Sequence, residues 1–255
     1  MRDTLAIILA YNEEASLPGV LRCLAASCPE LEVLVVNDGS EDRTGEVGRA
    51  AGARVVDLPY NSGVAAAEQT GFLHALDRGF LYAVRLDGDG QHDPADAARL
   101  LDELRAGTAD LVIGSRFLLP PAPGAGVAGG AGAGGAAGAG GPAGARPALA
   151  RRAGIAWLSF LVRALSGQAV TDPTSGFRAF NQRAVRFLAS AYPEDYPEPE
   201  SILMLARGGF RIAEVPAAFR VRQGGRSSIG RLEAFQYVLK VTFALLVQRL
   251  RRPGA

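Results

Sequence analysis

Acidic side chains crowd one short stretch in the middle of the chain. The sequence RLDGDGQHDP, residues 85–94, brings three aspartates, a glutamine and a histidine together directly after an apolar run. Carboxylates can hold Mg²⁺ or Mn²⁺, and these ions keep coordination positions open for phosphate oxygens. One interpretation of the D-x-D pair, Asp87 and Asp89, is therefore a metal site that clamps a diphosphate.

Two other D-x-D chemistries fit the surrounding residues less well. An EF-hand loop that starts at Asp87 needs glycine at its sixth position and glutamate at its twelfth, but these positions hold His92 and Ala98. A phosphatase of the haloacid-dehalogenase type needs a lysine later in the chain, and the only lysine is Lys240, near the C-terminus. The EF-hand is rejected, and the phosphatase is kept as a weaker alternative.

Composition and charge restrict the class of protein. The chain has 255 residues, of which 48% are hydrophobic, enough for the core of one large α/β domain or two small ones. Its net charge of +1 argues against a general nucleic-acid binder, because neutralising phosphates needs a large basic surplus. Cys23 and Cys28 have no partner histidine, so we expect reduced thiols in a cytoplasmic protein.

Short apolar runs alternate with helix-like segments through the first half of the chain. The runs at residues 5–9, 33–36, 54–58, 81–86 and 111–113 are expected to be strands. This βαβ repetition predicts an α/β fold with a mostly parallel sheet flanked by helices. Ligands of such sheets bind beyond the carboxyl ends of the strands. The polar residues at those ends are Tyr11, Asn12, Glu13, Asn37, Asp38, Asn61, Asp87, Asp89 and Arg116.

The second half begins with an unusual segment. Residues 120–147 contain only glycine, alanine and proline apart from Val127 and Arg146, so we expect a disordered surface excursion. A helix at 150–165, the loop TDPTSGFRAF, a strand near 210–215, the basic loop RVRQGGRSS and a last helix are expected after it. The apolar run of the last helix is too short to span a bilayer, so this helix either packs on the domain or lies on an anionic membrane surface.

Seven motifs in order resemble the family 2 glycosyltransferases, which have the GT-A (Rossmann-like) fold. They are AYNEE at 10–14, VVNDGSEDRT at 35–44, NSGVAAAEQTG at 61–71, LDGDGQHDP at 86–94, GSRF at 114–117, DPTSGFRAF at 172–180 and EVPAAFRVRQGGRSS at 214–228. The chain is similar to the dolichyl-phosphate mannosyltransferases and their bacterial polyprenyl-phosphate relatives. This resemblance covers nearly the whole chain.

The resemblance implies a single domain with a C-terminal helix. Residues 1–118 would form the nucleotide-sugar and metal-binding half, and residues 149–229 the acceptor-side half. Residues 119–148 would be a Gly/Ala/Pro-rich low-complexity loop, and residues 230–255 an amphipathic helix. We expect a cytoplasmic protein that is peripheral at the inner face of the membrane, with a small membrane protein as a further partner.

On the donor side, the resemblance assigns the nucleotide to residues that follow the first strands. These are Ala10, Tyr11, Asn12, Glu13, Asp38, Gly63 and Asp87. Asn12 and Asp38 could instead only cap the helices that follow them. The metal trio is Asp87, Asp89 and Gln91, whose spacing in an extended segment would point all three side chains to one side. Asp93 before Pro94 is expected to begin a helix.

On the acceptor side, the resemblance implies arginines in place of a general base. A phosphate oxygen is already anionic, so positioning by arginines suffices. The acceptor-phosphate residues would be Arg152, Arg178, Arg222 and Ser227, and the catalytic residues Asp89, Arg116, Arg222 and Glu200. Ser228 stands where the family has a lysine, and the stretch after GSRF is Gly/Ala/Pro sequence, so this chain departs from the family pattern on the acceptor side.

The activity that follows is that of an inverting, metal-dependent glycosyltransferase. It would move a sugar from a UDP- or GDP-linked donor to a polyprenyl phosphate, with Mg²⁺ or Mn²⁺ as cofactor. Two alternatives stay open. One is transfer to a saccharide hydroxyl in cell-wall or exopolysaccharide synthesis, and the other is a nucleotide-sugar-binding protein that has lost turnover.

Overall fold

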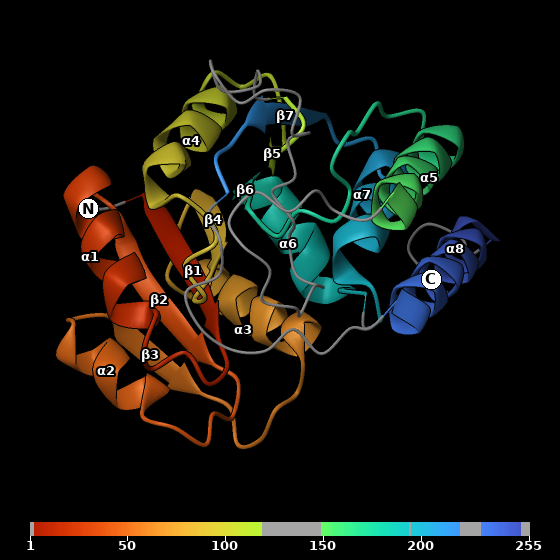
Figure 1. Cartoon of the computed structure of the whole chain (residues 1–255). Helices are drawn as coiled ribbons and strands as arrows, with labels where there is room; N and C mark the ends of the chain where they lie inside the picture. The colour runs from red at the N-terminus through yellow and green to blue at the C-terminus, as the bar shows by residue number, and fades with distance from the viewer. Residues whose placement is uncertain (1–2, 119–148, 194, 220–230, 251–255) are drawn as a thin grey trace, which may run out of the picture.

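The structure, a computed structural model, describes residues 3–118, 149–193, 195–219 and 231–250 (Figure 1). For residues 149–152 and 231–235 it describes the backbone alone. Strands and helices alternate through the first half, as the apolar pattern predicts. In chain order the elements are β1 (Thr4–Ala10), α1 (Leu17–Ser27), β2 (Glu32–Asn37), α2 (Thr44–Ala50), β3 (Arg54–Asp57), α3 (Val64–Asp77), β4 (Tyr82–Asp87), the 3-10 helix η1 (Pro94–Asp96), α4 (Ala97–Arg105), β5 (Leu111–Ser115), α5 (Leu149–Ser166), β6 (Arg178–Asn181), α6 (Gln182–Ser190), α7 (Pro197–Arg207), β7 (Ile212–Pro216) and α8 (Arg231–Leu250).

One mixed sheet organises the described residues. Its strand order is β3-β2-β1-β4-β6-β5-β7. All pairs are parallel except those that β6 makes with β4 and β5, which are antiparallel. The expectation of a mostly parallel α/β sheet is confirmed. The sequence did not reveal β6, because its four residues are too short for an alternation and follow the turn-forming residues of DPTSG.

Helices cover both faces of the sheet, and successive residues of β1 belong to opposite layers. Leu5 and Ile7 pack with Phe72 of α3, while Ala6 and Ile8 pack with the buried leucines of α1. Because both faces are buried, the strands read as unbroken apolar runs. A Cβ on Gly71 of α3 would lie 2.5 Å from Ile7 Cγ2, so this glycine lets the helix lie directly on the sheet.

The C-terminal half adds a second group of helices. In Figure 1, α8 lies beside α5 and α7, on the side of the molecule away from α1 and α2. The helix expected at 150–165, the strand near 210–215 and the last helix are found as α5, β7 and α8. None of the helices in the described part of the chain is long and apolar enough to cross a membrane. The disordered excursion expected at 120–147 and the basic loop at 220–228 lie outside the described residues.

Candidate active site

The predicted site residues gather at one edge of the sheet. The register aligns Ala10 at the end of β1 with Asn37 at the end of β2, and Leu9 with Asp87 at the end of β4. Since β6 is antiparallel to its neighbours, its beginning lies at this same edge. The loop at residues 172–177, which precedes β6, therefore sits beside the ends of β4 and β5. The tertiary structure thus adds the DPTSGF segment to the edge that the sequence predicted.

The loop after β1 is tied to the loop after β2. Asn12 has φ 55°, the single positive value among the described non-glycine residues, and asparagine tolerates this left-handed conformation. Its backbone N–H donates to Ser40 Oγ at 2.9 Å, and its Oδ1 accepts from Glu41 N at 2.9 Å. Glu13 N donates to Thr44 Oγ1 at 2.8 Å. Asn12 therefore links two loops and does not cap α1, while Tyr11 next to it is exposed.

Asp38 binds the beginning of a helix that is distant in sequence. Its Oδ1 accepts from Ser62 N at 2.7 Å, and its Oδ2 accepts from Gly63 N at 2.9 Å. Gly63 is the N-cap of α3 and has φ 87°, a conformation that favours glycine. The alternative expectation, that Asp38 caps the helix directly after it, is wrong, because the carboxylate holds the N-terminus of α3. Nucleotide contacts by Asp38 and Gly63 stay predictions.

The acidic segment is a turn, and the expectation of an extended segment is wrong. β4 ends at Asp87, and residues 88–90 turn with Gly90 at φ 75°. Asp89 Oδ1 accepts from Gln91 N at 2.9 Å, which closes the turn. The glycines on either side of Asp89 allow this. A Cβ on Gly88 would lie 3.1 Å from Leu9 O, so the chain passes close over β1.

His92 and Asp93 hold the far end of this turn. His92 is buried, its Nδ1 accepts from Asp87 N at 3.1 Å, and its ring stacks on Phe177 at 5.1 Å between centroids. Burial lowers the pKa of His92 to about 4, although Asp87 opposes this shift. Asp93 is the N-cap of η1 and accepts from Ala95 N at 3.2 Å, with a proline following. The expectation that Asp93 begins the next helix is confirmed.

The oxygen donors of this turn suit a hard divalent cation. The Asp87 side chain is one-third exposed (33%), and the Asp89 carboxylate and the half-buried Gln91 amide are the other donors. Within the described part of the chain, no three His, Cys, Asp or Glu residues are arranged to hold a metal by themselves. Mg²⁺ is commonly bound by one or two carboxylates, with water and substrate phosphates completing its coordination. These residues therefore fit an ion that shares its coordination with a diphosphate.

Arg116, directly after β5, forms a buried ion pair with a carboxylate. Its Nε donates to Asp172 Oδ2 at 2.6 Å and its Nη2 to Asp172 Oδ1 at 2.8 Å, and both side chains are buried. The guanidinium carbon lies 4.6 Å from the centroid of the Phe219 ring. This two-pronged ion pair joins the end of β5 to the loop at 172–177. The predicted catalytic role of Arg116 stays a prediction.

Two acids beside the candidate site, Asp172 and Glu214, were not singled out in the sequence. Glu214 Oε1 accepts from Asp172 N at 2.9 Å, and its Oε2 accepts from Thr171 N at 2.7 Å. Burial raises the pKa of Glu214, against the lowering effect of these backbone N–H groups. A connected series of contacts therefore runs from Arg116, after β5, through Asp172 in the loop to Glu214 in β7. Both acids stand in quoted motifs, but spacing alone cannot pair residues 42 positions apart.

Arg178 is inside the protein, so its assignment to the acceptor phosphate is wrong for this structure. Only 1% of its surface is exposed. Nε donates to Ser175 O at 2.7 Å, Nη1 to Ser201 Oγ at 2.9 Å and Nη2 to Pro173 O at 3.1 Å. The physical reason is strand β6, which the sequence did not reveal. Arg178 begins β6 and pairs with Arg85 in the middle of the sheet, so it cannot lie in a surface loop.

The remaining acceptor-side residues fall into two groups. Glu200 lies in the first turn of α7, and its Oε1 accepts from Tyr196 N at 3.1 Å, so it stabilises the beginning of that helix. Arg152 lies on α5, but its side chain is outside the described part. Arg222 and Ser227 also lie outside the described residues. The predicted roles of all four residues stay predictions.

A buried charge cluster behind Asp87 was also missed. Arg85 in β4 contacts Asp87, Glu68 of α3 and Glu198 of α7. Burial by itself lowers the pKa of Arg85, but the three carboxylates outweigh it and raise the pKa above its usual value. Burial raises the pKa of Glu68. The sequence signal was a lone arginine inside an otherwise apolar strand, although it did not indicate the partners.

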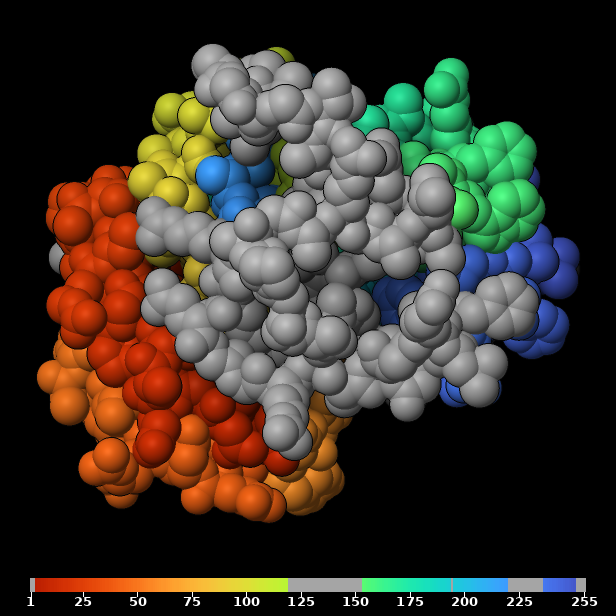
Figure 2. Space-filling model, viewed as in Figure 1, coloured from red at the N-terminus to blue at the C-terminus, as the bar shows by residue number. Residues whose placement is uncertain are grey.

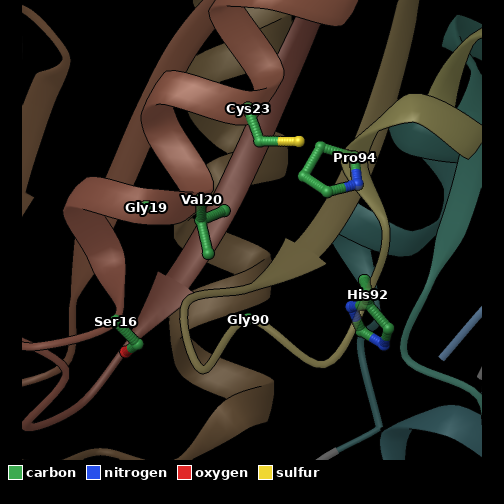
Figure 3. A pocket seen from close by; sticks show the side chains of 7 residues that line it. All are labelled: Ser16, Gly19, Val20, Cys23, Gly90, His92 and Pro94. Atoms are coloured by element: carbon green, nitrogen blue, oxygen red, sulfur yellow. The ribbon is translucent and has the colours of Figure 1, made fainter. Parts of the chain in front are cut away.

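A small cavity of about 80 Å³ lies behind the acidic turn (Figure 3). Figure 3 shows Ser16, Gly19, Val20 and Cys23, around the start of α1, on one side and Gly90, His92 and Pro94 on the other. Ligand pockets usually enclose roughly 300–1,000 Å³. This cavity is too small to hold a nucleotide sugar. Cys23 and Cys28 are both free thiols.

Comparisons with known proteins match the chain that carries this site to a family of enzymes. Residues 5–123 match the model of "Glycosyl transferase family 2". The chain is 34% identical over 247 residues to undecaprenyl-phosphate mannosyltransferase of Micrococcus luteus, covering 93% of this chain and 92% of that protein. It is 32% identical over 247 residues to polyprenol monophosphomannose synthase of Mycolicibacterium smegmatis, covering 93% of this chain and 85% of that protein.

Solved structures show the same fold. Glucosyl-3-phosphoglycerate synthase from Mycobacterium tuberculosis, in complex with UDP, superposes with a TM-score of 0.67 at 20% identity, over 99% of this chain and 82% of that one. Its complex with Mn²⁺, UDP and phosphoglyceric acid gives a TM-score of 0.66 at 21% identity, over 100% of this chain and 80% of that one. The predicted GT-A fold is confirmed. The chain belongs to glycosyl transferase family 2, in the subgroup of the polyprenyl-phosphate sugar transferases, and is a glycosyltransferase.

Proposed function

We propose that the protein transfers a sugar from a nucleotide diphosphate sugar to a polyprenyl phosphate, with inversion at the anomeric carbon and with help from a divalent cation. The observation that carries this proposal is the full-length similarity to two relatives whose names specify transfer of mannose to polyprenyl carriers. It covers 85% and 92% of those relatives, so both the donor half and the acceptor half are included. The sugar itself is not part of the proposal.

The acids on the acceptor side support an anionic acceptor. Attack by a sugar hydroxyl needs a carboxylate to take its proton, whereas a phosphate oxygen carries no proton that must be removed. Asp172 is held in its ion pair with Arg116, and Glu198 contacts Arg85 at 3.1 Å. A carboxylate whose oxygens are held by an arginine is not positioned to take a proton from a substrate hydroxyl. The arrangement therefore favours a phosphate nucleophile over transfer to a saccharide hydroxyl.

In the proposed reaction an oxygen of the lipid phosphate attacks the anomeric carbon of the donor sugar. The new carbon–oxygen bond forms as the bond from that carbon to the nucleoside diphosphate breaks, and the diphosphate leaves with the electron pair. Asp87 and Asp89 would hold the cation, with Gln91 as a third oxygen donor, while Asn12, Glu13 and Asp38 would face the nucleotide. The bound cation would neutralise charge on the departing diphosphate.

The nucleotide is proposed only as a uridine or guanosine diphosphate. The name of a relative from Methanococcus voltae, at 27% identity, specifies a UDP-linked sugar and dolichyl phosphate. Both synthase structures contain UDP and one also contains Mn²⁺, but at 20–21% identity they support the fold alone. A thermal-shift screen of UDP- and GDP-sugars with Mn²⁺ would identify the donor, because a ligand that binds the native state raises its apparent stability.

The helices α5 and α8 support a location at a membrane surface, where the lipid acceptor is found. Trp157 and Phe160 of α5 and Leu239, Phe243 and Leu246 of α8 are large apolar side chains that are 44–71% exposed. The two helices pack closely, with Trp157 Nε1 donating to Thr242 Oγ1 at 3.0 Å, and they adjoin at the right of Figure 2. Together their sequences contain six basic residues and one acid. Apolar side chains with basic ones suit an anionic membrane surface.

Asp89→Ala tests the proposed chemistry. We expect the variant to lose Mn²⁺-supported transfer of radiolabelled sugar to undecaprenyl phosphate, because one of the two carboxylates that hold the cation is missing. Asp102→Ala is a matched control, since Asp102 is an exposed acid on α4. Circular dichroism would check that both variants fold. Full activity of Asp89→Ala would refute the metal assignment.

The acceptor is tested by organic extraction of the labelled product. A sugar linked to a polyprenyl phosphate partitions into the organic phase, whereas a glycan stays in water. Label found only in water-soluble glycan would refute the lipid acceptor and support the saccharide alternative. Nucleotide binding without any transfer or donor hydrolysis would support a binding protein that has lost turnover.

A vesicle assay tests the membrane location. We expect Phe243→Glu to lower co-sedimentation with anionic vesicles of phosphatidylglycerol, because it places a charge where an apolar side chain would enter the lipid interface. Leu73→Glu is the matched control, since Leu73 is also an exposed apolar residue (54%) and lies on α3. Equal sedimentation of both variants and the unmodified protein would contradict a membrane role for the α5–α8 face.

A further inference from the structure

Arg85 is a charged residue in the centre of the sheet, with 2% of its surface exposed. It stands two residues before Asp87 in β4, so both side chains project from the same face of the strand. Its Nη2 lies 3.1 Å from Asp87 Oδ1, and its Nη1 lies 3.1 Å from Glu198 Oε1 and 3.3 Å from Glu68 Oε2. Burying an unpaired charge is costly, so these carboxylates explain how the strand tolerates it. One carboxylate would balance the single positive charge of the arginine, but three contact it.

The loop at 172–177 closes over this guanidinium. A Cβ on Gly176 would lie 3.0 Å from Arg85 Nη2, 3.1 Å from its Cζ and 3.1 Å from its Nη1. Gly176 has no positive φ, so its missing side chain serves space and not backbone conformation. β4, α3, α7 and this loop therefore fix the guanidinium from four directions. A side chain held in this way can in turn fix the carboxylate that it contacts.

We propose that Arg85 is a positioning residue for the cation site, holding Asp87 Oδ1 so that the Asp87 carboxylate is presented to the metal in one orientation. This inference rests on the proposed function, in which Asp87 and Asp89 bind the cation. Residues behind metal ligands orient them and tune their affinity for the ion. Arg85 would do this for the one aspartate that belongs to a rigid strand, while Asp89 is held by the turn.

Glu68 and Glu198 have a defined part in this arrangement. A carboxylate shared between an arginine and a cation binds the cation less well, because the arginine already neutralises it. Because Glu68 and Glu198 also contact the guanidinium, its positive charge is divided among three carboxylates. Asp87 is therefore only partly neutralised by Arg85. Glu198 belongs to α7, which packs against α5 and α8, so the metal carboxylate is connected to these helices.

The test measures binding of Mn²⁺ in the presence of UDP or GDP by electron paramagnetic resonance, which does not depend on turnover. We expect Glu198→Gln and Arg85→Lys to weaken Mn²⁺ binding by about 10–100-fold. Lysine keeps the charge but lacks the planar fork that reaches several carboxylates. Nucleotide affinity measured with EDTA present should change less than about twofold, since a merely structural defect would lower both affinities. Gly176→Ala, which removes no charge, should weaken Mn²⁺ binding in the same direction but by less.

Asp110→Asn is the matched control for losing a buried carboxylate. Asp110 contacts Arg183 and Arg211 at the beginning of β5, at the opposite edge of the sheet, so its variant should bind Mn²⁺ normally. Unchanged Mn²⁺ binding in the Glu198, Arg85 and Gly176 variants would overturn the inference and leave the proposed function intact. An unmodified protein that binds the nucleotide but shows no binding of Mn²⁺ would overturn both. If Glu198→Gln fails to fold, Gly176→Ala decides the matter.

Discussion

The ion pair between Arg116 and Asp172 allows structure and catalysis to be separated. Arg116→Met would leave the Asp172 carboxylate fully buried without its cation, and Asp172→Asn would leave the guanidinium without its charge partner. Removing one member of a buried ion pair costs about 3–5 kcal/mol. For a chain of this size, about 1 kcal/mol corresponds to roughly 2 °C or more in Tm, so each variant should lose about 6–10 °C. The double variant that combines Arg116→Met with Asp172→Asn should lose less stability than the sum of the two single losses, because no unpaired charge is left.

The assay is chemical unfolding followed by circular dichroism, with sugar transfer measured on the same samples. Arg183→Met is the control, because Arg183 is an exposed arginine whose contact with Asp110 is 3.4 Å long, and a pair of this kind contributes about 0–1 kcal/mol. Transfer should fall only as far as the folded fraction falls. The reasoning is refuted if Arg116→Met lowers the free energy of unfolding by less than about 1 kcal/mol and yet abolishes transfer, since Arg116 would then have the catalytic role that the family resemblance implies.

The remaining predictions concern the nucleotide edge, the metal and pH. Asp38→Asn should destabilise the protein by about 1–3 kcal/mol, because an amide NH₂ would face the N–H of Ser62 or Gly63, and equal denaturation midpoints would contradict this. Dialysis against EDTA should abolish transfer and added Mn²⁺ should restore it, whereas activity that survives chelation would argue against a cation. Burial, with Arg54 and Arg78, lowers the pKa of His74. Below its unfolded pKa near 6.5 the unfolded state then binds a proton more readily than the folded state, so stability should fall as pH drops through about 6.5. His74→Gln should reduce this fall in urea midpoints compared between pH 7.5 and pH 5.5, and an unchanged dependence would exclude His74.

Local pattern determined much of the fold. The apolar runs of β1, β2, β4 and β5 are buried on both faces, so their sequences are unmistakable, and the turn residues after them marked one edge of the sheet. Asp93 before Pro94 was recognisable as the start of a helix, because capping depends only on neighbours in sequence. The strand β6 was not recognisable, since a strand of four residues is defined by its partners, which lie 65 or more positions away.

The candidate site divides in the same way. The sequence by itself determined the family, the run of oxygen donors from Asp87 to Gln91 and the edge of the sheet that carries them, because these depend on residue types and short spacings. Only the tertiary structure decided that Arg116 faces Asp172, that Arg178 is buried and that Arg85 stands behind Asp87 between Glu68 and Glu198. The physical reason is that an arginine in a sequence is only a charge. Whether it binds a phosphate, supports a loop or orients another side chain depends on which carboxylates the fold brings to it.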